Sequence, residues 1–292
     1  MLNRPRSAFR QRLLSYRLWS HRRCTPHIIT ASHDLRYLIY PESAMDFEIA
    51  IKGIYDDWIS TNLARLARPD GVVFDIGANV GLLTLPFARI HVPQGTVYAF
   101  EPDLENFAQL LTNIRINRLQ NVLAVPIALQ DDSALREVIL YRRRATTPEG
   151  LNNNGLSTIQ PMPGLMSSEQ RTHATTLDQF VLDRGIRRVD FLKIDVEGAE
   201  AKVLRGGLET LRTHLPVVLY EYSLILDDLM AIDNSAQSFL LLKGLGYRQF
   251  QISGEGTLVE MSAPSDSIAL ANILSFHRSA APTWVSEGVR TN

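Results

Sequence analysis

The sequence predicts an α/β fold in which helices cover a doubly wound, mostly parallel sheet. From residue 70 onward, short apolar runs of the kind found in strands alternate with longer amphipathic stretches. These short runs are apolar on both faces, which is typical of parallel strands buried beneath helices. A glycine-containing turn follows the first run and leads directly into a helix, as in the βαβ units that bind nucleotides.

The predicted elements follow one another in a regular order. We expect strands at 72–74, 96–100, 122–125, 189–194 and 217–220, helices at 82–90, 104–117, 199–211 and 236–245, and a closing antiparallel pair at 247–252 and 271–276. In the helix at 104–117, apolar residues recur on one face at helical spacing. These residues are Leu104, Phe107, Ala108, Leu111 and Ile114.

The alternation is interrupted between about residues 129 and 176. This insertion contains a candidate hairpin strand at 137–143 and a loop rich in asparagine and glycine at 150–155. Insertions at the ends of a rigid sheet often carry the contacts to a substrate. We therefore expect this segment to contribute to the choice of substrate.

Three further segments flank the predicted domain at 70–278. Residues 1–33 form a basic arm with seven arginines and no acidic residue, 34–69 form a preface with helical character, and 279–292 form a polar tail. The arm fits a poorly ordered tail, a mitochondrial transit peptide or an amphipathic segment on an anionic membrane surface. We expect the preface to share the choice of substrate with the insertion.

The charges of the chain are unevenly distributed. The 292 residues have a net charge of −1, but the part from Asp34 onward has 23 basic and 31 acidic residues and a net charge of −8. Because a nucleic-acid interface needs a basic face, we expect no nucleic-acid partner. No run reaches the ~18 apolar residues that span a bilayer, and Cys24, the only cysteine, has no internal disulfide partner. We therefore expect a cytoplasmic protein.

The turn after the first strand has the features of an adenosine site. Asp75 lies at the strand end, and Gly77 and Gly81 let the backbone turn sharply and approach a ligand. Glu101 ends the next strand, at the spacing of an acid that binds ribose hydroxyls. Dinucleotide enzymes typically have a G-x-G-x-x-G turn, and an acid before the glycines would repel a pyrophosphate. Asp75 instead suits a ligand with a charged amino group, such as the methionyl part of S-adenosylmethionine.

Several motifs together resemble the FkbM-type methyltransferase family. The similarity spans about residues 70–222, in the order and spacing of the family. The matching segments are 74–84 (FDIGANVGLLT), 99–102 (AFEP), Asn113, Asn117, 176–178 (TLD), 190–200 (DFLKIDVEGAE) and 204–206 (LRG).

This resemblance implies a fold, a cofactor and a reaction. The fold is that of a class I methyltransferase (Rossmann-like), a doubly wound, mostly parallel seven-stranded sheet with one antiparallel strand. The cofactor is S-adenosylmethionine, and the reaction is O-methylation of a sugar, glycolipid, polysaccharide or natural-product acceptor. Carried over residue by residue, the cofactor contacts are Asp75, Gly77, Asn79 and Gly81 for the methionyl part, Glu101 for the ribose, and Asp103 and Ala128 for the adenine.

Methyl transfer to a hydroxyl needs alignment of the acceptor and a group that takes its proton. Lys193 and Asp195 point to the same face at the end of the fourth strand. A lysine in a central strand is costly unless it is paired, so we expect it to pair with Asp75, Asp195 or Glu221 and to orient one carboxylate. Asp195 is our first candidate for the catalytic group. Glu197 and Glu221 are second, and Glu197 would equally suit the N-terminus of the following helix.

The sequence leaves two alternative roles for each of several other polar side chains. His173 could be a base or a solvated loop residue, and the arginines at 142–144 could meet an anionic acceptor or form a solvated hairpin edge. Converging carboxylates could hold Mg²⁺, although nothing in their spacing requires a metal.

Three other functions compete with methyl transfer to a small-molecule or glycan hydroxyl. A nicotinamide-dependent oxidoreductase is disfavoured by Asp75 and Asn79, and a noncatalytic cofactor-binding module by the full set of strand-end acids. An RNA methyltransferase is disfavoured by the acidic body. The sequence contains no code for the identity of the acceptor or for the oligomeric state.

Overall fold

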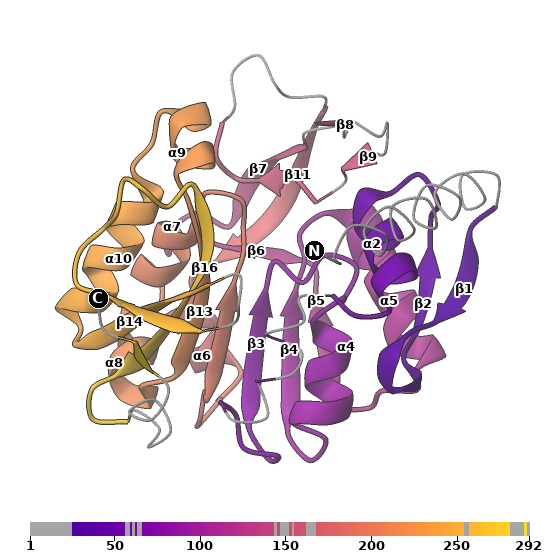
Figure 1. Ribbon diagram of the computed structural model, residues 1–292, viewed down its shortest axis with the longest axis horizontal. Helices are drawn as coiled ribbons and strands as arrows, with labels where there is room; N and C mark the ends of the chain where they lie inside the picture. Colours follow the sequence, from indigo (N-terminus) through magenta and orange to yellow (C-terminus); the bar gives the residue numbers. More distant parts are fainter. Residues whose placement is uncertain are drawn as a thin grey trace, which may run out of the picture.

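The computed structural model describes residues 25–55, 59, 62, 66–142, 145–146, 152–153, 155–161, 168–253, 257–280 and 289–290. A central sheet runs through the molecule, and a smaller sheet lies beyond the tips of its parallel strands (Figure 1). Most of the basic arm, Arg143, Arg144, three residues of the loop at 150–155 (Gly150, Leu151 and Asn154) and most of the polar tail lie outside the described residues.

The central sheet has nine strands in the described part of the chain, in the order β17-β15-β14-β16-β13-β12-β3-β4-β5. Their bounds are β3 (Val72–Ile76), β4 (Thr96–Phe100), β5 (Val122–Val125), β12 (Phe191–Ile194), β13 (Val217–Ser223), β14 (Tyr247–Ile252), β15 (Leu258–Met261), β16 (Leu270–His277) and β17 (Val289–Arg290). The five strands from β13 to β5 are mutually parallel. Strand β16 is antiparallel to both β13 and β14, so the predicted closing pair is confirmed.

The strand count differs from the seven strands that the resemblance implied. The seven strands from β5 to β14 contain one strand, β16, that runs against the others. Strand β15 then pairs antiparallel to β14, and β17 pairs parallel to β15. The chain therefore extends the sheet at the edge beyond β14, where a further strand finds free backbone donors and acceptors.

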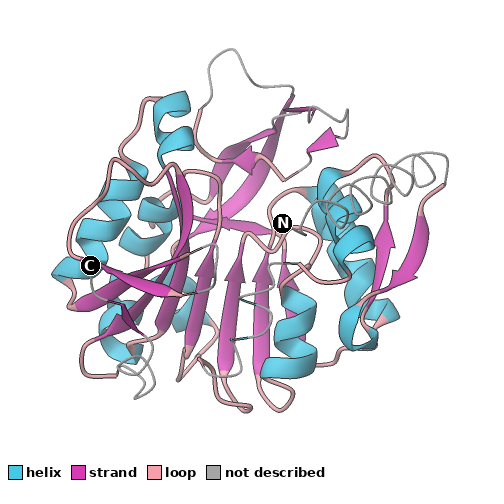
Figure 2. Ribbon diagram, in the orientation of Figure 1, coloured by secondary structure: helices cyan, strands magenta, loops and turns pink. Residues whose placement is uncertain are grey.

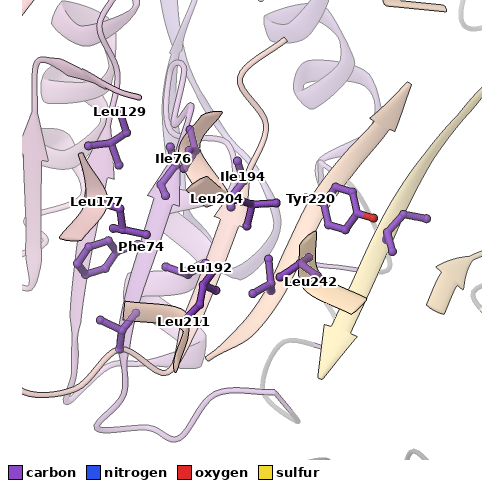
Figure 3. Close-up of a cluster of buried hydrophobic side chains, with 14 of the residues drawn as sticks. Phe74, Ile76, Leu129, Leu177, Leu192, Ile194, Leu204, Leu211, Tyr220 and Leu242 are labelled. Atoms are coloured by element: carbon purple, nitrogen blue, oxygen red, sulfur yellow. The ribbon is translucent and has the colours of Figure 1, made fainter. Parts of the chain in front are cut away.

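Helices cover both faces of the parallel strands (Figure 2). One face carries α6 (Leu177–Asp183), α7 (Glu200–Arg205), α8 (Leu208–His214) and α10 (Asn234–Gly244), while α9 (Leu224–Met230) follows β13. On the other face lie α4 (Thr84–Pro86), the short π-helical segment η3 (Phe87–His91) and α5 (Leu104–Ile116). Figure 3 shows Leu177, Leu204, Leu211 and Leu242 of the first helix group against Phe74, Leu192 and Tyr220 of the sheet.

Two predicted helices are divided. The helix expected at 199–211 breaks into α7 and α8 at Gly206 and Gly207. A Cβ on Gly206 would lie 2.1 Å from the carbonyl oxygen of Gln130, and one on Gly207 would lie 2.6 Å from Leu177. Only glycine fits these close approaches. The helix expected at 82–90 forms as α4 followed by η3.

The insertion between residues 129 and 176 forms most of a second, four-stranded sheet. Its order is β10-β7-β11-β6, with β6 (Ile127–Leu129), β7 (Glu137–Arg142), β10 (Ser157–Thr158) and β11 (Ser168–Thr175). A short separate pair consists of β8 (Ala145–Thr146) and β9 (Asn152–Asn153). In Figure 1 the arrowheads of β3 and β4 point toward this second sheet, which places it at the carboxyl ends of the parallel strands.

The preface contains a hairpin as well as the expected helix. Strands β1 (His27–Thr30) and β2 (Arg36–Ile39) pair antiparallel, and α2 (Ala44–Lys52) follows them. Residues 27–30, which the sequence assigned to the basic arm, thus begin this unit. Among the described residues, no helix combines the length and apolar character needed to cross a membrane.

Two asparagines, Asn113 on α5 and Asn117 directly after it, hold the hairpin against the domain. The side chain of Asn113 accepts a hydrogen bond from Leu38 N (2.8 Å) and donates one to Val80 O (2.8 Å). The side chain of Asn117 accepts a hydrogen bond from Arg36 N and donates one to Arg36 O. The face predicted for α5 is therefore only partly buried: Leu104 and Leu111 are exposed, whereas Asn113 is completely buried. Polar residues replace apolar ones here because the edge of β2 needs hydrogen-bond partners.

Replacing Asn113 should test this attachment. Asn113→Leu leaves the N–H of the half-buried Leu38 and the buried Val80 carbonyl unpaired, and we expect it to lower the free energy of unfolding by about 3 kcal/mol. Urea denaturation measures the change. Leu111→Asn on the same helix is the matched control and should change stability by less than about 0.5 kcal/mol, since that side chain is exposed. Equal effects of the two substitutions would contradict this account.

Candidate functional site

A cleft of about 300 Å³ lies at the carboxyl ends of β3, β4, β12 and β13. This is the edge at which open α/β sheets bind ligands. Its floor includes the turns after these strands, and β10 of the second sheet and α2 of the preface contribute walls. Three segments that are distant in sequence therefore meet around one cavity.

The glycine turn fits against the neighbouring strand end without room for a side chain. Gly77 has a φ of 80°, and a Cβ there would lie 1.8 Å from the carbonyl oxygen of Asp195. Asn79 adopts a φ of 49°, and both residues line the cleft. Gly81 (φ 91°) lies deeper, where a Cβ would meet Leu110 at 2.7 Å. The first glycine thus shapes the cleft, and the second permits packing on α5.

Glu101 is held at the cleft by the backbone. Its carboxylate accepts hydrogen bonds from Asn79 N (2.7 Å) and Asp103 N (2.9 Å). Burial raises the pKa of Glu101 to about 7, although these two hydrogen bonds oppose the shift. Each carboxylate oxygen has one bond and so retains a lone pair for a ligand hydroxyl. The Glu101 side chain is thus fixed in position and can still accept hydrogen bonds from a ligand.

Lys193 forms the ion pairs expected of it. Its Nζ lies 3.4 Å from Asp75 Oδ1 and 3.4 Å from Asp195 Oδ2, and it donates to Gly77 O at 2.7 Å. Thr84 Oγ1 donates to the second oxygen of Asp75. Burial lowers the pKa of Lys193, but the charges of Asp195 and Asp75 outweigh it and leave the pKa raised. The lysine is therefore a fixed cation.

The two carboxylates beside Lys193 differ in exposure. The side chain of Asp75 is completely buried, whereas that of Asp195 is 36% exposed and lines the cleft. Burial raises the pKa of Asp75 despite the nearby lysine. Asp75 therefore serves as the buried ion-pair partner of Lys193, and Asp195 is the carboxylate of this group that a ligand can reach.

Further carboxylates gather beside Asp195. Glu197 and Glu221 line the cleft. Burial, followed by the charge of Asp195, raises the pKa of Glu221 to about 9 and that of Glu197 well above its ordinary value. At neutral pH Glu221 therefore holds a proton and can donate a hydrogen bond.

Two residues predicted to contact adenine are used differently. Ala128 lines the cleft. Asp103 is buried and caps α5, accepting from Glu105 N at 2.9 Å and Asn106 N at 3.4 Å. It also pairs with Arg142 Nε at 2.7 Å and accepts from Ser157 Oγ at 2.9 Å. Its position joins the second sheet to the βαβ unit.

Of the other polar side chains, His173 lies on β11 with 76% of its side chain exposed. Arg142 forms ion pairs with Asp103 and Glu105. In the described part of the chain, no three histidine, cysteine or acidic side chains are grouped so as to hold a metal ion.

The family model described as the methyltransferase FkbM domain matches residues 75–248. The chain belongs to this family. The match includes the strand-end residues from Asp75 to Glu221 and leaves out the preface, so α2 adds a wall to the cleft from outside the FkbM domain.

Curated relatives of this FkbM-family chain include named methyltransferases. It is 33% identical over 159 residues to the 31-O-demethyl-FK506 methyltransferase FkbM of Streptomyces tacrolimicus, covering 48% of this chain and 60% of that protein. It is 29% identical over 170 residues to the 2-O-methyltransferase NoeI of Sinorhizobium fredii, covering 55% and 67%. The chain thus spans about three fifths of the length of the first relative.

A solved structure of a methyltransferase FkbM from Methylobacillus flagellatus aligns with a TM-score of 0.42 and 12% identity, covering 77% of this chain and 56% of that one. A putative rRNA-methylase from Clostridium thermocellum aligns with a TM-score of 0.45 and 9% identity, covering 76% and 94%.

Some cleft residues of this FkbM-family chain were not predicted. Met45, Glu48 and Tyr55 come from the preface, and Ser157 and Thr158 come from the insertion. Both segments were expected to contribute to substrate choice, but no local pattern distinguishes these side chains from surface residues.

The raised pKa values predict how stability depends on pH. Burial raises the pKa of Glu101 and Glu200 to about 7 and that of Glu221 to about 9, against 4.5 for an exposed glutamate. The folded state therefore binds more protons than the unfolded state from about pH 5 to about pH 9, and the free energy of unfolding should fall as the pH rises through this range. Urea denaturation at several pH values measures this slope.

Glu221→Gln should flatten that slope and stabilise the chain at about pH 8 by roughly 2 kcal/mol, because the neutral amide needs no proton on folding, whereas Glu221 must take one up. Exposed Glu209→Gln is the control and should leave the slope unchanged. A wild-type chain that gains stability as the pH rises would contradict this prediction.

Proposed function

We propose that this chain is an S-adenosylmethionine-dependent O-methyltransferase whose acceptor is a hydroxyl group of a sugar-containing or natural-product compound. The observation that carries the proposal is the placement of Glu101 and Asp195 on the two strands that flank the Gly77 turn, in one cleft. Glu101, which suits ribose hydroxyls, therefore lies on one side of Gly77. Asp195, an exposed carboxylate paired with Lys193, lies on the other side.

The cleft fits the cofactor in three respects. Gly77 leaves no side chain where the turn faces Asp195. Glu101 retains acceptor capacity for two ribose hydroxyls, and acidic groups suit the positively charged methionyl amine and sulfonium. We assign Gly77 and Asn79 to the methionyl part, Glu101 to the ribose and Ala128 to the adenine. Asp75, Gly81 and Asp103 are not among the lining residues of the cleft: Asp75 pairs with Lys193, Gly81 lies against Leu110, and Asp103 donates its backbone N–H to Glu101. The bound cofactor supplies an electrophilic methyl group.

Asp195 is the residue that we assign to the acceptor. Lys193 fixes one of its oxygens, and its exposed part faces the cleft. There it can accept a hydrogen bond from the acceptor hydroxyl, align the oxygen and take its proton. Glu221, protonated at neutral pH, can donate a hydrogen bond to a second oxygen of a polyhydroxyl acceptor, and Glu197 borders the same space.

The charge of the cleft favours neutral or cationic acceptors. Lys193 is the one basic side chain of its described lining and is already paired with Asp75 and Asp195, so an anionic acceptor would find no free cation there. Arg142, considered for an anionic acceptor, is engaged by Asp103 and Glu105. Transfer to an oxygen also agrees with the names of two relatives, a 31-O and a 2-O methyltransferase.

Calorimetry with S-adenosylhomocysteine tests the cofactor assignment. We expect micromolar binding by the wild type and at least about tenfold weaker binding by Glu101→Gln, which replaces one ribose acceptor with a donor. Glu105→Gln, on the outer face of α5, is the control and should bind like the wild type. If NAD binds and S-adenosylhomocysteine does not, the chain is a nicotinamide-dependent enzyme instead.

Methyl transfer tests the role of Asp195. With methyl-labelled S-adenosylmethionine and a panel of sugar and natural-product acceptors, Asp195→Asn should lower the transfer rate by about 100-fold. Binding of S-adenosylhomocysteine should stay within about threefold of the wild type, since the amide keeps the shape of the side chain. Asp183→Asn on the surface of α6 serves as the control. Wild-type rates for Asp195→Asn would remove this residue from the reaction.

A further inference from the structure

The loop after β12 has a backbone conformation that its sequence does not favour by itself. Glu197 has a φ of 56°, and Gly198, next to it, has a φ of 92°. Two successive residues in the left-handed region are unfavourable when the first is not glycine, so the surroundings must hold them there. This loop carries Asp195 and Glu197, two of the carboxylates of the cleft.

Glu200 supplies the hydrogen bonds that close this loop. Its Oε1 accepts from Val196 N at 2.9 Å and from Gly198 N at 3.4 Å. The side chain is 1% exposed and does not line the cleft. One buried carboxylate oxygen therefore pairs two backbone N–H groups on either side of Glu197.

Asn234 fixes the other oxygen of Glu200. Its Nδ2 donates to Glu200 Oε2 at 2.5 Å, while its Oδ1 accepts from Ala201 N at 2.9 Å. Asn234 begins α10 and is also buried. Because both ends of its amide are engaged, the amide cannot flip without losing a bond. The loop is thus tied through Glu200 to a helix that packs against the sheet.

We propose that Glu200 and Asn234 are a positioning pair that holds the 195–198 loop in its left-handed turn and so presents Asp195 and Glu197 to the cleft. The position of this loop also sets the space at the glycine turn, because the carbonyl of Asp195 lies directly against Gly77. On the other side, Gly198 faces Met230, whose Sδ would lie 3.1 Å from an added Cβ.

The donor and acceptor pattern allows a swap experiment. In Glu200→Gln the new amide nitrogen faces the amide nitrogen of Asn234, so two donors meet. In Asn234→Asp, at alkaline pH, two carboxylates meet. The double variant Glu200→Gln/Asn234→Asp restores a donor opposite an acceptor at this contact and keeps acceptors for Val196, Gly198 and Ala201.

Two measurements are made on the wild type, the two single variants and the double variant. Hydrogen–deuterium exchange of peptides spanning 195–199 reports the loop in the ligand-free chain, and calorimetry with S-adenosylhomocysteine reports the cleft; this second measurement rests on the proposed function. Asp178→Asn is the matched control, because Asp178 accepts from Glu209 N at 3.0 Å and Thr210 N at 2.8 Å and lies outside the cleft.

We expect each single variant to exchange the amides of Val196 and Gly198 about tenfold faster and to bind S-adenosylhomocysteine about tenfold more weakly. The double variant should return to within about threefold of the wild type in both measurements. Asp178→Asn should lower the melting temperature but leave both measurements at the loop and the cleft unchanged. Rescue by the swap separates a specific contact from a general loss of stability.

Unchanged exchange at Val196 and Gly198 in both single variants would overturn the proposal. So would a double variant that exchanges faster than either single variant or fails to fold. If the wild type binds no S-adenosylhomocysteine, the exchange measurements still decide the role of the pair, and it is the proposed function that fails.

Discussion

The arrangement of the cleft depends on neutralising Lys193 within a parallel sheet. Its strand neighbour in register is Asp75, and Asp195 follows two residues later on the same strand end. A lone buried ammonium would be strongly unfavourable, so both carboxylates are needed where they are. The same pairing divides their roles: Asp75 is enclosed and serves the lysine, whereas Asp195 keeps an exposed part. The charge balance of one strand therefore determines which acid a ligand can meet.

Much of the fold could be predicted because parallel strands buried on both faces have a strong sequence signal. The observed β4 and β5 have the predicted bounds, and β3, β12 and β13 differ by a few residues at one end. The strand-end acids were predictable for a related reason, since strand order brings the residues that follow β4, β3 and β12 to one edge. The pairing of Lys193 followed from the cost of burying its charge.

What sequence reasoning missed depends on contacts between distant segments. Leu104 and Leu111 have helical spacing yet are exposed, because α5 offers Asn113 and Asn117 to the backbone of β2 instead. Glu200 appeared only as part of a motif, and its bonds to the 195–198 loop require the left-handed turn at Glu197. The walls from α2 and β10 likewise exist only once separate units dock. Periodicity within one element cannot predict these partners.

The cleft is assembled from segments that are far apart along the chain. Lys193 and Gly77, which share a hydrogen bond, are separated by 116 residues, whereas Glu101 and Asn79 are separated by only 22. The ribose-side half can therefore form early during synthesis, while the half that contains Asp195 and Glu221 must wait for β12 and β13 to emerge. Closing such long loops is slow compared with local folding. A ligand that contacts both halves would bind only the completed domain, and so would report the end of folding rather than its beginning.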